Sequence, residues 1–232
     1  MTLNEKCLLA GLAGIIFTVG AAVANEYPVK VTGLWESKYV LEGRDILGTG
    51  GLVSVEATTE WRHATLGAWF AAADSISYRE LNLSAELAFA FAGCEAYLGY
   101  TRLEFITDDE GDNELTTGVA MTSLPWVTPA LDYTYSTEAS GGFLEISLRL
   151  EIPLFDGRLT LEPYALEGFD FGFASDDYNG PNHLELGIDI GAIITNRVSL
   201  IGLIAHSWAH ADVARDELDD LSWAAVGLRM DL

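Results

Sequence analysis

Strict alternation over residues 143–152 is the feature that most constrains the fold of this chain. At the helical period its charged residues would be spread around the whole helix, so the pattern favours an extended strand. The polar side carries Glu145, Arg149 and Glu151, which a dry core could hold only if they were paired, whereas a water-filled lumen could hold them singly. The opposite side is wholly aliphatic and consists of Leu144, Ile146, Leu148, Leu150 and Ile152.

Composition supports a protein with one apolar and one hydrated face. Apolar residues make up 50% of the 232 residues, yet the formal net charge is -23. A soluble acidic protein usually gains such a charge at the expense of hydrophobicity, whereas the mean hydropathy here is positive. The acidity argues against nucleic acid as a partner, because phosphates are bound by Lys and Arg. The alternative is that the charge serves only solubility.

The N-terminus resembles a secretory signal, predicted to span residues 1–24. Lys6 precedes an apolar run over residues 7–20, and Ala22-Val23-Ala24 gives the small-x-small pattern of a cleavage site before Asn25. Glu5 weakens the positive start, which leaves an uncleaved anchor as the alternative. Residues 25–232 are then one domain whose lone Cys94 cannot form an internal disulfide.

The mature chain divides into about twelve alternating stretches, each close to the length of a tilted membrane strand. Short turns and longer polar connections alternate along the chain, which is typical of a transmembrane antiparallel up-and-down β-barrel with both termini on the periplasmic side. Ten or fourteen strands are the alternatives. The stretches lie near residues 30–41, 51–60, 63–73, 79–90, 94–105, 114–123, 126–136, 142–152, 158–168, 183–194, 197–208 and 220–232.

Aromatic residues lie mostly toward the ends of these stretches, as expected for interfacial girdles. Trp35, Trp61, Trp69, Trp126 and Trp223 are among them.

The last stretch alternates back from the C-terminus, and this resembles the terminal strand by which the barrel-assembly machinery recognises outer-membrane proteins. Leu232, Met230 and Leu228 alternate with Asp231 and Arg229. That terminal strand usually ends in Phe or Trp, and Leu232 differs from it.

Several short motifs are similar to those of the TorF-type porins, small outer-membrane proteins of Gram-negative bacteria. Residues 37–44, Ser-Lys-Tyr-Val-Leu-Glu-Gly-Arg, resemble the family's opening motif, although Glu42 stands where the family has arginine and Arg44 follows two places on. Residues 67–70 and 81–83 resemble its Gly-x-Trp and Glu-x-Asp-Leu segments. The resemblance implies a barrel and diffusion of small solutes.

The charged residues on the polar faces are the candidate pore-lining residues, with nine carboxylates against three bases. An open pore lined in this way would concentrate cations and repel anions. Alternatively, the three bases pair with neighbouring carboxylates and help to fill a narrow lumen. The set is Glu36, Lys38, Glu56, Glu86, Asp132, Glu145, Arg149, Glu151, Glu162, Glu185, Asp189 and Arg229.

No catalytic, metal or cofactor site is predicted. His206 and Ser207 point to opposite faces of a strand, and His206 and His210 are about 13 Å apart along one, too far to share a metal. The acidic stretch 108–114 lacks the regular spacing of a calcium loop.

The predicted function is therefore a porin-like channel of the Gram-negative outer membrane for passive diffusion of small solutes, with a preference for cations. The expected partners are outer-membrane lipid and lipopolysaccharide, the barrel-assembly machinery and the solutes. The alternatives are a closed barrel with a structural or adhesive role through its acidic loops, and a barrel enzyme that acts on lipid.

Overall fold

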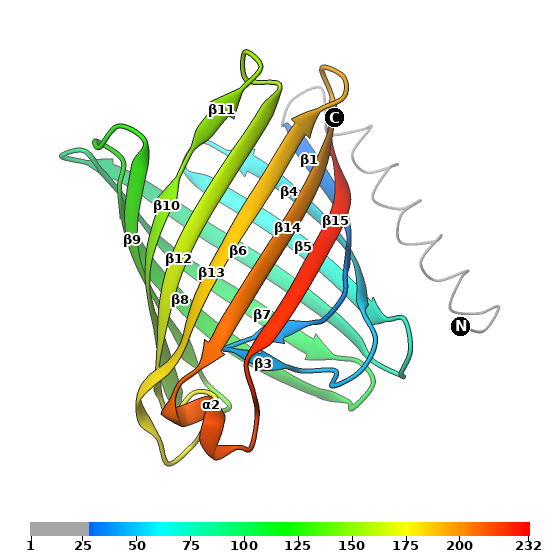
Figure 1. Cartoon of the computed structure of the whole chain (residues 1–232), viewed down its shortest axis with the longest axis vertical. Helices are drawn as coiled ribbons and strands as arrows, with labels where there is room; N and C mark the ends of the chain where they lie inside the picture. The colour runs from blue at the N-terminus through cyan, green and yellow to red at the C-terminus, as the bar shows by residue number, and fades with distance from the viewer. Residues whose placement is uncertain (1–27) are drawn as a thin grey trace.

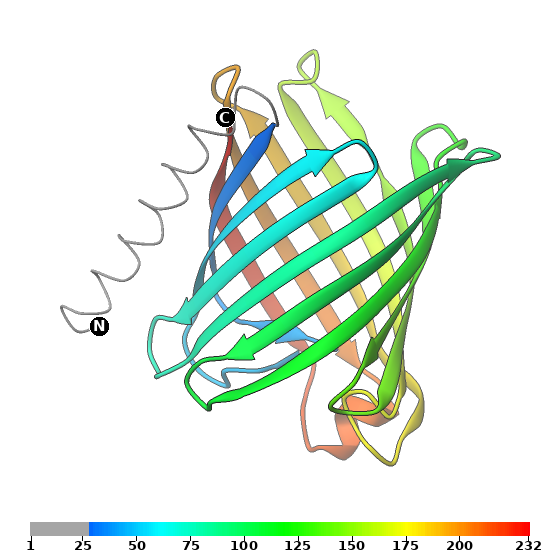
Figure 2. The same ribbon diagram turned by 180° about the vertical axis from the view of Figure 1, so that it is seen from behind.

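The computed structural model describes residues 28–232, so the predicted signal peptide lies outside the described residues. Antiparallel strands form a closed ring (Figures 1 and 2). In ring order the wall consists of β1 (Val29–Glu36), β4 (Leu52–Trp61), β5 (Ala64–Ala73), β6 (Arg79–Phe91), β7 (Cys94–Phe105), β8 (Glu110–Met121), β9 (Val127–Ser136), β10 (Gly141–Leu150) with β11 (Ile152–Leu154), β12 (Leu159–Phe171), β13 (Asn179–Ile193), β14 (Val198–Ala209) and β15 (Leu221–Asp231).

The predicted twelve-stranded barrel is confirmed. β10 and β11 form one wall strand that is interrupted at Glu151, and both segments pair with β12 to close the ring. Three predicted boundaries were wrong, one of them the start of β13, which begins at Asn179 rather than near residue 183. The first strand ends at Glu36 rather than near residue 41, and β8 begins at Glu110, so the polar stretch 110–113 is strand instead of loop.

The alternating faces also have the predicted chemistry. On β10, Ile146, Leu148 and Leu150 are 46%, 49% and 41% exposed on the outer surface of the ring. Between them, Arg149 points to the inner face and forms ion pairs with carboxylates of β12 and β13. The outer wall is therefore apolar although it is exposed, the reverse of a soluble protein.

The tryptophans follow the predicted girdles only in part. Trp61 and Trp126 are exposed next to turns, at 57% and 77%. Trp69 instead packs against the buried residue Tyr39, and Trp223 is buried, so these two side chains fill space at the barrel mouth. Sequence position near a strand end did not distinguish the two environments.

The two rims of the barrel differ. The short-turn rim, where β1 begins and β15 ends, carries tight connections such as Ala92-Gly93, both of which have positive φ as a two-residue hairpin turn requires. The long-loop rim carries the connections 37–51, 172–178 and 210–220. No helix within residues 28–232 has the length and hydropathy of a membrane-spanning helix.

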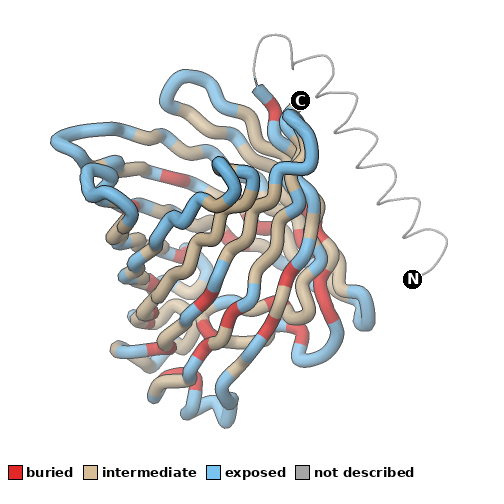
Figure 3. The backbone as a smooth tube through the Cα atoms, turned by 45° about the horizontal axis from the view of Figure 1, so that its top comes forward, coloured by how far each residue is buried: buried red, intermediate tan, exposed pale blue. Residues whose placement is uncertain are grey.

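The connection after β1 does not remain on the surface. It forms a small hairpin of β2 (Val40–Leu41) and β3 (Arg44–Asp45), which lies between the walls of the ring near the long-loop rim (Figures 1 and 2). Helix α2 (Ala211–Arg215) packs beside β13 at the same rim. Buried residues gather there, as Figure 3 shows, so the core of the protein lies at one mouth of the barrel.

Candidate functional site

A base and two carboxylates meet on the inner face of neighbouring wall strands. Arg149 of β10 forms ion pairs with Asp189 of β13 and with Glu162 of β12, the latter over 3.5 Å. Its guanidinium also lies 4.8 Å from the centre of the Tyr164 ring. The alternation of β10, β12 and β13 points these side chains to the same side of the sheet. Two of the carboxylates are thus neutralised in part by one base.

Other inner carboxylates are held by tyrosine hydroxyls. The Tyr97 hydroxyl donates to Asp132 over 2.6 Å, and the Tyr164 hydroxyl donates to Glu185 over 2.5 Å. Glu145 lies directly opposite Asp132 on the neighbouring strand. Like charges in directly opposed positions destabilise a sheet. This part of the interior therefore keeps an excess of negative charge.

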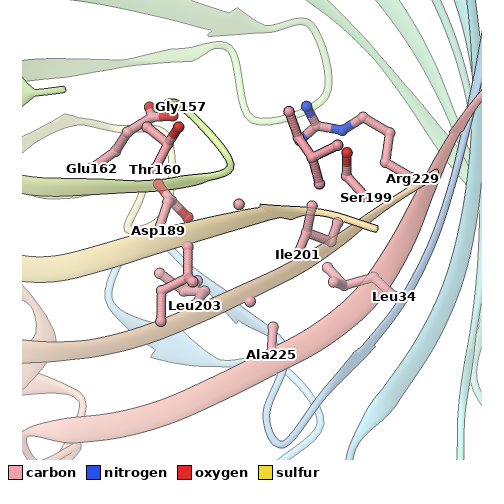
Figure 4. A pocket seen from close by; sticks show the side chains of 14 residues that line it. Leu34, Gly157, Thr160, Glu162, Asp189, Ser199, Ile201, Leu203, Ala225 and Arg229 are labelled. Atoms are coloured by element: carbon pink, nitrogen blue, oxygen red, sulfur yellow. The ribbon is translucent and has the colours of Figure 1, made fainter. Parts of the chain in front are cut away.

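A cavity of about 470 Å³ lies on the inner face between β12 and β1. Figure 4 shows the carboxylates Glu162 and Asp189 on one side of it and the Arg229 guanidinium, next to Ser199, on the other. The register places Glu56 and Arg229 on either side of Thr32. The rest of the lining is largely apolar and includes Leu34, Ile201, Leu203 and Ala225.

The structure spreads the predicted pore-lining residues around the ring. Lys38 lies beyond the end of β1, where it forms an ion pair with Asp45 over 3.1 Å, so its predicted place on a wall strand was wrong. Glu151 lies at the break between β10 and β11. The others lie on β1 (Glu36), β4 (Glu56), β6 (Glu86), β9 (Asp132), β10 (Glu145, Arg149), β12 (Glu162), β13 (Glu185, Asp189) and β15 (Arg229).

Ionisable residues at the mouth were missed by the sequence analysis. Arg44 of β3 donates to Asp216 over 2.9 Å and to Asp212 of α2 over 3.1 Å. Asn182 donates to Asp212 over 2.6 Å. Burial opposes ionisation of Asp212, but the hydrogen bonds from Asn182 and Arg44 outweigh it, and the pKa of Asp212 is lowered. The loop that carries α2 is thereby tied to the β2–β3 hairpin.

Two further inner carboxylates, Glu80 and Glu114, were also missed, although the sequence carries a signal for them. Glu80 has the same parity as Glu86 on β6, and Glu114 has the opposite parity to the apolar, exposed Leu115 and Val119 on β8, so alternation alone assigns both to the inner face. The contacts of Arg44 had no detectable signal in the sequence, because its partners lie more than a hundred residues away in the chain.

The residues considered for catalysis or metal binding do not come together. The buried Ser207 and the outward His206 lie on opposite faces of β14, as predicted, and His206 instead bonds to Ser222 of β15 over 2.6 Å. His210 pairs with Glu167 over 3.1 Å. Within residues 28–232, no group of three or more His, Cys, Asp or Glu side chains is arranged to hold a metal ion.

Solved structures with the same fold include porins. The KdgM porin has a TM-score of 0.62 at 9% identity, over 87% of this chain and 98% of that chain. The NanC porin has a TM-score of 0.59 at 8% identity, over 88% of this chain and 100% of that chain. A KdgM porin in complex with disordered oligogalacturonate has a TM-score of 0.57 at 10% identity, over 88% and 98%.

No known sequence family and no curated protein matches the chain, so the TorF-type resemblance remains a prediction. The structural likeness shows that the chain has the fold of porin-like outer-membrane channels.

Proposed function

We propose that this protein is an integral barrel of the Gram-negative outer membrane that lets small solutes diffuse passively and prefers cations. The exposed aliphatic outer wall supports the membrane location, because hydrocarbon is the solvent in which such a surface is stable. The fold shared with porins supports a channel.

The excess of carboxylates on the inner face is the observation that carries the preference for cations. Arg149 and Arg229 are the bases among the predicted lining residues that remain on wall strands, and Arg149 is already paired. Glu145 and Asp132, opposed on neighbouring strands, have no base between them. A negative interior raises the local concentration of cations and lowers that of anions.

The negative charge of the interior also predicts that the permeant solutes differ in charge from the ligand of one structural neighbour. Oligogalacturonate, bound in a KdgM structure, carries a carboxylate on each sugar. The carboxylates that line this interior would repel such a polyanion. We therefore propose neutral and cationic small solutes as the permeant class.

The test is the reversal potential of the refolded protein in a planar bilayer with a potassium chloride gradient. Refolding is verified first by the heat-modifiable shift in gel mobility. We expect a steady conductance and a reversal potential of the sign set by potassium. A folded barrel that does not conduct, or one that prefers chloride, would refute the proposal, and the former would favour the closed barrel with a structural role.

A further inference from the structure

The connection after β1 crosses the mouth of the barrel from one wall to the opposite wall. We call residues 37–47, which include β2 and β3, the crossing hairpin. At one end, the Tyr39 hydroxyl donates to Glu80 of β6 over 3.0 Å. At the other, Gly43 packs against His183 of β13. Five wall strands separate β6 from β13 in either direction around the ring, so the two attachments are diametrically opposed.

The tip of the crossing hairpin is held closely. Gly43 has φ +71°, and a Cβ there would lie 2.9 Å from His183 Cβ, so the turn requires glycine for both its conformation and its space. Arg44, the next residue, is bonded to Asp212, Asp216 and Ser175. The hairpin is thus a fixed bar across the mouth.

One side of this bar is filled by apolar packing. Tyr39 and Leu47 of the hairpin form a buried cluster with Leu52 of β4 and Ala71 of β5, and Trp69 packs against it. A cluster of this kind leaves no room for water or ions. The mouth is therefore closed between the hairpin and β4–β5.

The other side of the bar contains a cavity instead of a packed apolar cluster. A cavity of about 470 Å³ lies there between the hairpin residues Leu41 and Glu42 and the wall strands β6 to β9. Six carboxylates line it. Glu138 and Asp176 come from loops, and four come from the hairpin and the wall: Glu42, Glu80, Asp112 and Glu114. A solute that enters between the crossing hairpin and this wall passes these groups.

Two of the four carboxylates from the hairpin and the wall are occupied by hydrogen bonds. Glu80 accepts from Tyr39, Tyr78 and Asn82. Asp112 accepts from the hydroxyls of Ser136 and Thr137 and from backbone N–H groups. Among residues 28–232, no side chain donates a hydrogen bond to the carboxylate of Glu42 or Glu114. These two carboxylates remain available to a passing cation.

We propose that the crossing hairpin is the entrance filter of the channel and that Glu42, opposite Glu114, selects cations there by charge. This inference rests on the proposed channel function. It assigns part of the cation selectivity of that channel to one residue of the first long loop. Selectivity is then set at the mouth, in addition to the acidic wall below it.

The surroundings of Glu42 make this filter sensitive to pH. Burial, followed by the charges of Glu114 and Glu145, raises the pKa of Glu42 to about 8. Glu42 is therefore mostly neutral at pH 6 and mostly ionised at pH 9, and its contribution to cation preference should appear as the pH rises. The charged and titratable groups around the hairpin tip are Arg44 on the hairpin, Glu80 and Tyr39 at its root, Asp112 and Glu114 on β8, Glu138 and Asp176 on adjacent loops, Glu145 on β10, Asp170 on β12 and His183 on β13.

The first experiment compares Glu42→Gln with Glu110→Gln, each as the refolded full barrel in a potassium chloride gradient. Glu110 is an exposed carboxylate at the end of the β7–β8 turn and lies outside the cavity, so its replacement controls for the loss of one negative charge at the same rim. A unit charge about 6 Å from a cation changes the local cation concentration about threefold even in water. Because the same charge enriches cations and depletes anions by about threefold each, we expect Glu42→Gln to lower the ratio of cation to anion permeability by up to about tenfold at pH 9. The change should be much smaller at pH 6, and Glu110→Gln should change the ratio little at either pH.

The outcomes separate this inference from the function on which it rests. A wild-type channel that prefers cations, with Glu42→Gln unchanged at pH 9 or equal to Glu110→Gln, would overturn the filter and leave the channel standing. A wild-type barrel that does not conduct or that prefers anions would overturn both.

A second variant covers a failure of Glu42→Gln to fold. Glu42→Cys in a Cys94→Ala background is treated during recording with a small positively charged methanethiosulfonate reagent, since Cys94 is the free cysteine of the described chain. We expect the current to fall and the cation preference to be lost. Complete labelling, verified by mass, without a change in current would show that Glu42 does not lie in the permeation path.

Discussion

Replacing Leu148 by arginine should destabilise the barrel strongly, whereas the same replacement at the adjacent Ser147 should not. Leu148 lies near the middle of the wall strand formed by β10 and β11, and its side chain is 49% exposed on the outer surface. Its neighbours in register are Pro129 of β9 and Ala165 of β12, so no carboxylate lies directly opposite to receive a guanidinium. Ser147 points to the acidic interior.

The size of the difference follows from the two environments. An arginine that faces lipid near the middle of the bilayer costs about 2–4 kcal/mol. Loss of the leucine removes about 2 kcal/mol of apolar burial, so Leu148→Arg should lower the free energy of unfolding by about 4–6 kcal/mol. Ser147→Arg introduces the same charge beside carboxylates in water, and we expect a change within about 1 kcal/mol.

The assay is urea unfolding of the barrels refolded into lipid vesicles, followed by tryptophan fluorescence and by the shift in gel mobility. A difference of about 4 kcal/mol corresponds to more than a hundredfold change in the folding equilibrium. Equal destabilisation of the two variants would refute the assignment of the strand faces. If neither variant were destabilised, the aliphatic outer wall would not lie in hydrocarbon.

Two further predictions concern the interior and the long-loop rim. Arg149→Met should increase the preference for cations in the reversal-potential measurement, because it frees Asp189 and Glu162 from their base, and an unchanged potential would place this cluster outside the conducting path. Asp74→Asn should flatten the dependence of urea stability on pH below about 4. The hydrogen bond from the Gly51 N–H lowers the pKa of Asp74, and the resulting stabilisation is present above the unfolded pKa of about 3.9 and is lost as the pH falls through the lowered value. Parallel acid profiles of the wild type and the variant would contradict this.

The wall of the barrel could be predicted from sequence because every wall residue has only two environments. Lipid and water impose period-2 alternation on a strand such as β10, and the turn residues around Ala92-Gly93 mark where a strand ends. The bar across the mouth could not be predicted in the same way. Tyr39 and Arg44 find their partners at residues 41 and 168 positions away, and the alternation around them continues that of β1. The predicted strand 30–41 therefore extended into residues that leave the wall.

The unequal pairing of charge on the inner face is the strongest physical argument that the barrel encloses water. Glu145 lies directly opposite Asp132, an arrangement that is unfavourable in a sheet. Arg149, four residues along the same strand, is instead paired with Asp189 and Glu162. In a dry interior the unpaired carboxylates would have to be protonated or would destabilise the fold, whereas mobile cations in a hydrated lumen screen them within about a Debye length. The unpaired carboxylates that would destabilise a dry core are the same groups that would attract cations into a water-filled channel.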